Sequence, residues 1–162
     1  MVYARVDLSI TKDPLKEIRE NLQQYKVIVH KEVKRHGRAL SSLHDAFEKF
    51  KASRDAAGFK TIQEEADSEL ASVLSQLELA VTKTASIDGV YSRNLVSLIV
   101  LLKERVKLIK ELHSEVTTFL KDAKLSADSE KKKKLTAFID ATEARLGDVR
   151  DKIQVALKAV SD

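Results

Sequence analysis

Clusters of lysine and arginine are the features of this chain whose spacing suggests a chemistry, the binding of anions. One cluster flanks an expected turn between two helices and consists of Lys121, Lys124, Lys131, Lys132, Lys133 and Lys134. A second lies inside a long helical stretch and consists of Lys103, Arg105, Lys107 and Lys110. Each lysine or arginine held near an anionic membrane contributes about 1 kcal/mol to binding. We therefore predict that these ten residues bind membrane anions; the alternative is that each cluster is a solvated helix face.

The basic clusters match a lipid surface better than a nucleic acid. Arginine is scarce, and no aromatic side chains that would stack on bases accompany the lysines. A smooth anionic membrane requires neither feature. The sequence thus favours an anionic lipid surface as the partner and argues against nucleic acid.

The sequence contains no motif that is typical of a catalytic site or of a metal-binding site. No HExxH pair occurs among the histidines, which are His30, His36, His44 and His113. His36 falls on the apolar stripe of its helix, and we interpret it as a packed residue. An acidic group opens an expected helix, where the helix dipole favours carboxylates; it consists of Glu64, Glu65, Asp67 and Glu69. Phosphate-binding loops and nucleophile elbows are also missing, so we expect no catalytic, cofactor or metal site and no enzyme.

The composition is typical of long solvated helices in one domain. The 162 residues include 33% charged and 5% aromatic residues, one proline and no tryptophan. Cysteine is absent, which favours a cytoplasmic setting, and the net charge of +4 permits an anionic partner. No apolar run approaches the roughly 20 residues that span a bilayer, and we expect no signal peptide.

The chain divides into a short leader, residues 1–12, and a helical bundle domain, residues 13–162. Met1 to Thr11 alternates apolar and polar residues, a strand pattern with no second strand to pair with. We expect an extended leader along the bundle; the alternatives are a strand added to a partner or symmetry mate, or the remnant of a preceding domain. Asp13-Pro14 then predicts a helix start. Apolar residues of this first helix recur every 3.5 residues on average, which indicates a coiled-coil-like seam. Ala57-Gly58 is expected to end it, and Thr61-x-x-Glu64 to cap the next helix.

The stretch from Phe59 to Ala123 decides the architecture. Apolar or small residues recur there at steps of three and four, as one helical stripe requires. Asp88-Gly89 interrupts the stripe, and Asp-Gly is a common turn pair. Helical phase is nevertheless kept across it through Val81, Thr84, Ile87, Tyr91 and Leu95. We therefore favour one continuous helix kinked near Gly89 over two helices joined by a turn.

Two all-α architectures follow, both of long antiparallel amphipathic helices in a coiled-coil-like bundle. After Ala123, residues 124–129 are expected to form a loop and a cap, and the last helix to run to Val160 with Gly147 near a close helix contact. A continuous middle helix would leave both its ends with one neighbour, which predicts a homodimer. A turn at Asp88-Gly89 would instead give a four-helix up-down bundle. The predicted core is Leu22, Val29, Leu40, Phe47, Leu74, Leu77, Leu98, Leu102, Ile109, Val116, Ile139, Leu146, Val149 and Ile153.

The helix order over residues 13–160, the very long middle helix and the lysines at the last turn resemble the BAR family of membrane-curvature proteins. Members of that family dimerise through three long, kinked helices and touch lipid with a tip loop and a concave basic face. The resemblance implies that Lys121, Lys124 and Lys131 to Lys134 form the tip. It also implies that Lys103, Arg105, Lys107 and Lys110 form the concave face.

The sequence is therefore compatible with three functions, none of which requires a cofactor. The first is a non-catalytic scaffold that dimerises and binds anionic membranes peripherally. The second is a protein-binding adaptor or structural assembly subunit. The third is a bundle that inserts into membranes or carries lipid, with the apolar run from Leu95 to Leu102 as the inserting segment.

Overall fold

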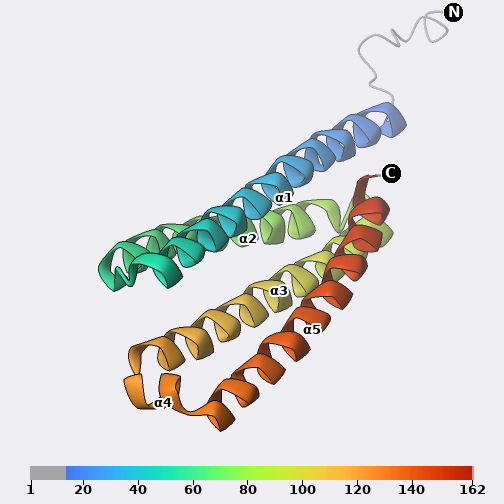
Figure 1. The fold of residues 1–162 in the computed structure, drawn as a ribbon. Coiled ribbons are helices and arrows are strands. Elements are labelled where there is room, and N and C mark those ends of the chain that lie inside the picture. The colour runs from blue at the N-terminus through green and yellow to red at the C-terminus, as the bar shows by residue number, and fades with distance from the viewer. Residues whose placement is uncertain (1–13, 162) are drawn as a thin grey trace, which may run out of the picture.

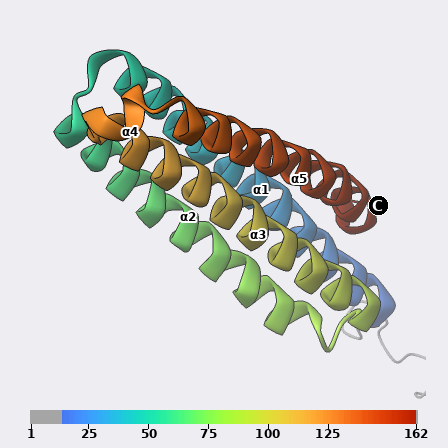
Figure 2. The ribbon, with the colours of Figure 1, turned by 60° about the horizontal axis from the view of Figure 1, so that its bottom comes forward.

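The computed structural model describes residues 14–161, and the regular structure in that range is entirely helical. The long helices are α1 (Pro14–Ser53), α2 (Ala56–Thr84), α3 (Gly89–Lys121) and α5 (Ser129–Ser161). A short helix, α4 (Ala123–Ala127), links α3 to α5. The long helices pack side by side as an antiparallel bundle (Figures 1 and 2). The predicted all-α class is confirmed; the strand-like leader, Met1 to Thr11, lies outside the described residues.

The first chain reversal lies three residues earlier than the sequence suggested. Arg54 has a left-handed backbone (φ 61°) and turns the chain, and the Asp55 side chain then accepts a hydrogen bond from the Gly58 N–H at 3.0 Å. Gly58 thus belongs to the first turn of α2, where a Cβ would collide with the Asp55 carboxylate. Thr61 bonds back to the Ala57 carbonyl inside the helix. The predicted stop at Ala57-Gly58 and the predicted Thr61 cap are therefore wrong.

The second reversal, at Asp88, shows that the continuous middle helix is also wrong. The chain stays close to helical beyond Thr84, because the Ala85 and Ile87 N–H groups still donate to carbonyls of the last turn of α2. Asp88 is then extended (φ −150°, ψ 98°), and its side chain caps α3 by accepting from the Tyr91 N–H at 3.1 Å. Helical phase survives because most of the turn is helical, while the direction reverses at one residue.

This turn makes the molecule a four-helix up-down bundle. The Ser92 hydroxyl donates to the Val81 carbonyl at 3.0 Å and ties α3 to α2. The very long middle helix, one of the features behind the BAR resemblance, is therefore absent. The homodimer was inferred from uncovered ends of that helix, so this reason for it no longer applies, and the homodimer stays a prediction.

The core extends along the bundle in three clusters that contain all fourteen predicted core residues. Leu77, Leu98 and Leu102 are fully buried. Partly exposed members of the predicted set pack against the edges of the clusters; they are Leu22, Leu74, Ile109, Ile139 and Leu146. Leu95 and Ile99 are also buried, so the apolar run Leu95 to Leu102 supplies much of the packing between helices.

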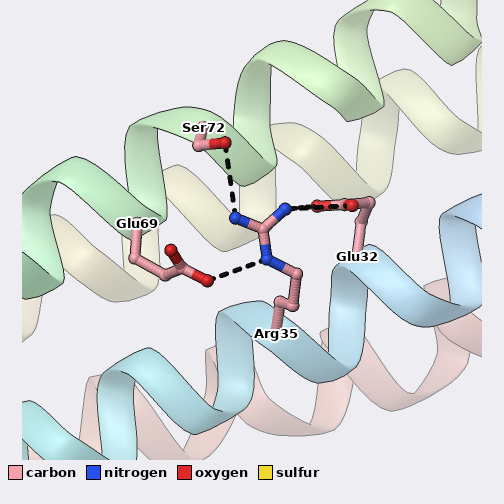
Figure 3. A network of polar contacts seen from close by, with 4 residues as sticks. All are labelled: Glu32, Arg35, Glu69 and Ser72. Atoms are coloured by element: carbon pink, nitrogen blue, oxygen red, sulfur yellow. Dashed lines mark hydrogen bonds and ion pairs between the residues drawn. The ribbon is translucent and has the colours of Figure 1, made fainter.

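A polar network around Arg35 sets α1 against α2 (Figure 3). The Arg35 guanidinium donates to Glu69 at 2.8 Å, to Ser72 at 3.3 Å and to Glu32 at 2.8 Å. Glu32 is buried, and without this cation its carboxylate would be an uncompensated charge inside the bundle. Hydrogen bonding from Arg35 also lowers the pKa of the Glu69 carboxyl. Arg35, Glu32 and Glu69 thus hold the two helices together and are not free charges on the surface.

Gly147 does not lie at a close helix contact, contrary to the sequence-based expectation. A Cβ built at this position would meet nothing within 4 Å. Gly147→Ala is therefore expected to raise the free energy of unfolding by about 1 kcal/mol, the difference in helix propensity. Urea unfolding would measure it. Gly58→Ala is the contrasting variant and should lower stability, because its Cβ displaces the Asp55 cap.

Candidate anion-binding end of the bundle

Four segments meet at one end of the bundle: the α1–α2 junction, the last turns of α3, the whole of α4, and the start of α5. We call this end the α4 end. Figure 2 shows these segments together, opposite the end that holds the α2–α3 turn and the C-terminus. The expected loop at residues 124–129 is in fact mostly helical, as α4. The Ser126 hydroxyl closes this segment by donating to the Phe119 carbonyl of α3 at 3.0 Å.

The six lysines predicted around the last turn all lie at the α4 end and are exposed. Lys121 ends α3, Lys124 lies in α4, and Lys131 to Lys134 form the first turns of α5. Within residues 121–134 the opposing acids are Asp122, Asp128 and Glu130, which leaves an excess of three positive charges. Asp128 caps α5, where its side chain accepts from the Glu130 and Lys131 N–H groups at 2.9 and 3.3 Å.

The middle-helix cluster, by contrast, does not form one free basic face. Lys103 pairs with Glu78 at 3.1 Å and Lys110 pairs with Asp67 at 2.7 Å, so both contact α2. Arg105 turns inward, and its Nη2 lies 3.0 Å from His36 Nδ1 of α1. Lys107 is exposed. The sequence could not show this division, because each partner comes from another helix.

His36 and His113 are buried inside the bundle, which confirms the interpretation of His36 as a packed residue. Burial, with a contribution from Arg105, lowers the pKa of His36 to about 4. Burial also lowers the pKa of His113 to about 4, with smaller effects from His44 and Lys51. The His113 ring stacks on Phe47 with 3.9 Å between centroids. Both imidazoles are thus neutral at pH 7.

Two adjoining cavities open at the α4 end. The first, of about 430 Å³, has a polar wall made by Lys60, Lys110, Lys121, Ser114, Thr117 and Thr118. His113 also lines it, and its Nδ1 is buried without a hydrogen-bond partner in the described part of the chain. The second, of about 560 Å³, lies against Leu120 and Ala127. Phe50, Ala56 and Lys121 line both cavities.

Sequence reasoning missed Arg54 and Lys60 as members of this end. Arg54 lines the second cavity and Lys60 the first, each beside Lys121 of α3. Both lie near the α1–α2 turn, which a continuous middle helix would have kept away from the last turn. The reversal at Asp88 brings the two turns to the same end.

Neither a metal-binding cluster nor a membrane-spanning helix occurs along residues 14–161. No three histidine, aspartate or glutamate side chains there come together to hold a metal ion. None of the described helices has the length and apolar character needed to cross a bilayer. No protein-family model matches the chain, and neither a curated protein nor a solved structure is significantly similar to it. Function is therefore inferred from the charges and contacts of the α4 end.

Proposed function

We propose that this protein binds anionic membrane surfaces peripherally through the α4 end of its bundle. The binding residues are Lys121 and Lys124 together with Lys131 to Lys134, and Arg54 and Lys60 lie at the same end. This end can meet a flat surface while the core stays packed. The role needs no catalytic group and no cofactor.

The position of the lysine run in α5 carries the proposal. A helix N-terminus bears a partial positive charge, so cations there cost stability, about 0.3–1 kcal/mol each within the first turn. Lys131 and Lys132 lie in that turn, and Lys133 and Lys134 follow directly. Lys51 and Lys121, at the C-terminal ends of α1 and α3, by contrast complement the helix dipole. Helix stability therefore does not explain the run, whereas contact with an anionic surface does.

The expected affinity is modest. At about 1 kcal/mol per lysine near the surface, four to six engaged side chains give a Kd between about 1 mM and tens of micromolar. Screening acts over about 8 Å at physiological ionic strength, so added salt weakens the binding. The middle-helix residues contribute less, because Lys103 and Lys110 are already paired with acids of α2.

Vesicle co-sedimentation tests the proposal. The protein should pellet with vesicles that contain about one third phosphatidylserine and stay in solution with pure phosphatidylcholine. Raising the salt concentration should release it. Equal pelleting with both vesicles, or with neither, would contradict the proposal.

A protein-binding bundle is the second candidate, favoured by exposed aliphatic side chains on α1. Ile18, Val27 and Ile28 are 43%, 59% and 40% exposed. Such residues scattered singly are common on protein surfaces, which makes this the weaker case. Substituting Val27 and Ile28 with serine should leave vesicle binding unchanged and would weaken only the binding of a protein partner.

A further inference from the structure

The two cavities at the α4 end differ in chemistry although they share part of their lining. Three ammonium groups and three hydroxyls line the first cavity, while the second lies mainly against apolar side chains. Their shared lining consists of the apolar residues Phe50 and Ala56 together with Lys121. A molecule that lies across both would place a charged group in one compartment and an apolar group in the other.

The first compartment is equipped to hold a dianionic, oxygen-rich group. Lys60 and Lys121 are exposed and can reach a ligand without breaking an ion pair recorded among the described residues. The hydroxyls of Ser114, Thr117 and Thr118 make no hydrogen bond to the described chain. Other helical threonines, such as Thr82 and Thr136, bond back to a carbonyl four residues earlier. These hydroxyls are therefore available to a ligand.

His113, beside these lysines and hydroxyls, is a further observation that favours a polar ligand in the first compartment. The residue is 4% exposed, lines the first compartment, and has a buried Nδ1 with no hydrogen-bond partner in the described chain. A buried polar atom without a partner costs about 1–3 kcal/mol. A phosphate in this compartment would add acceptor oxygens close to the ring.

The second compartment suits a single alkyl chain. Leu120, Ala127 and Phe50 present apolar surface there. Arg54, Lys121 and Ser126 also line this compartment. Each methylene removed from water contributes about 0.8 kcal/mol. The two volumes, about 430 and 560 Å³, fall in the range of small-ligand sites.

We infer that this pair of cavities binds one single-chain phosphate amphiphile, with the phosphate between Lys60 and Lys121 and the alkyl chain against Phe50 and Leu120. The site goes beyond the surface binding proposed above, because it takes one dissolved molecule and does not use Lys131 to Lys134. A phosphate alone lacks the apolar contact, and an alkyl chain with a cationic head meets the wrong charge. The site therefore selects for both halves of the ligand.

Isothermal titration calorimetry with decyl phosphate below its micelle concentration tests this site without vesicles. One equivalent should bind with a Kd in the micromolar range, while inorganic phosphate and decyltrimethylammonium should each bind at least tenfold more weakly. Lys60→Glu and Lys121→Glu should each weaken decyl phosphate binding at least tenfold. Thr117→Val, which keeps the side-chain shape, should weaken it severalfold.

Lys83→Glu, an equal charge change at the other end of α2, is the matched control and should leave the affinity unchanged. The inference is overturned if decyl phosphate gives no binding heat, if decyltrimethylammonium binds as tightly, or if inorganic phosphate alone accounts for the affinity. Equal loss in Lys60→Glu and Lys83→Glu would overturn it as well. A variant with Lys131 to Lys134 changed to glutamate should bind decyl phosphate like the native chain, so failure of this site is distinguishable from failure of vesicle binding.

Discussion

Acidification from pH 7 to pH 4 is expected to lower the free energy of unfolding by about 5 kcal/mol through His36 and His113. Both are buried, at 0% and 4% exposure, and both have a pKa lowered to about 4. In the unfolded chain each would have its usual pKa of about 6.5, so between these values the unfolded state binds more protons. The stabilisation that these neutral histidines contribute is therefore present above about pH 6.5. It is lost as the pH falls from 6.5 to 4, which lowers the free energy of unfolding by about 2–3 kcal/mol per histidine. Such a loss is comparable to the whole stability of a marginal domain.

Urea unfolding at both pH values, with one histidine removed, isolates this effect from the carboxylates. His113→Leu places an apolar side chain among Phe47 and Phe59, which contact the native ring. This variant should lose about 2–3 kcal/mol less on acidification than the native chain. Removing the exposed His30 by substitution with glutamine should leave the loss unchanged. An identical loss in His113→Leu and the native chain would show that burial of this imidazole does not control acid stability.

Changing Lys131, Lys132, Lys133 and Lys134 together to glutamate is expected to abolish binding to phosphatidylserine vesicles. The change removes four of the six lysines around the turn and takes the net charge from +4 to −4, because each substitution subtracts two. At about 1 kcal/mol per lysine, the lost attraction alone weakens binding by roughly a factor of 1000, and repulsion adds to it. The fold should persist, since carboxylates at the start of α5 suit the helix dipole.

A control with the same net charge separates local contact from overall charge. Arg145, Arg150, Lys152 and Lys158 are exposed on α5 away from the α4 end. Changing these four to glutamate also gives a net charge of −4. Co-sedimentation should show clear residual binding for this control and none for the Lys131–Lys134 variant. Equal loss in both would mean that net charge, and not the lysine run, sets the affinity.

The apolar stripes predicted the helices and the core because burial is a periodic property of the sequence. Leu77, Leu98 and Leu102 are buried as their spacing requires. The direction of the chain was less predictable. The turn before Asp88 is nearly helical, so the apolar stripe continues through it and does not reveal the reversal. In the first turn the left-handed residue is Arg54 and not a glycine.

The candidate site was predictable only where its residues are adjacent in sequence. Lys131 to Lys134 are found as a run and remain exposed at one end. Arg105 shares the basic composition of its neighbours but meets His36, 69 residues away, in the core. The cavities combine Lys60 of α2, Lys121 of α3 and Phe50 of α1, whose proximity depends on two chain reversals. Pairings of this kind arise from tertiary packing and have no local signal.

Placing one fluorophore at either end of the bundle tests the central claim, that the α4 end faces the membrane, most directly. The chain has no cysteine, so Ser129→Cys at the α4 end and Ser86→Cys in the α2–α3 turn each create a single labelling site; both serines are exposed. An environment-sensitive dye at residue 129 should shift to the blue and brighten when phosphatidylserine vesicles are added. The same dye at residue 86 should keep its aqueous spectrum. A response at residue 86 equal to or larger than that at residue 129 would contradict the assignment of the α4 end as the membrane-binding surface.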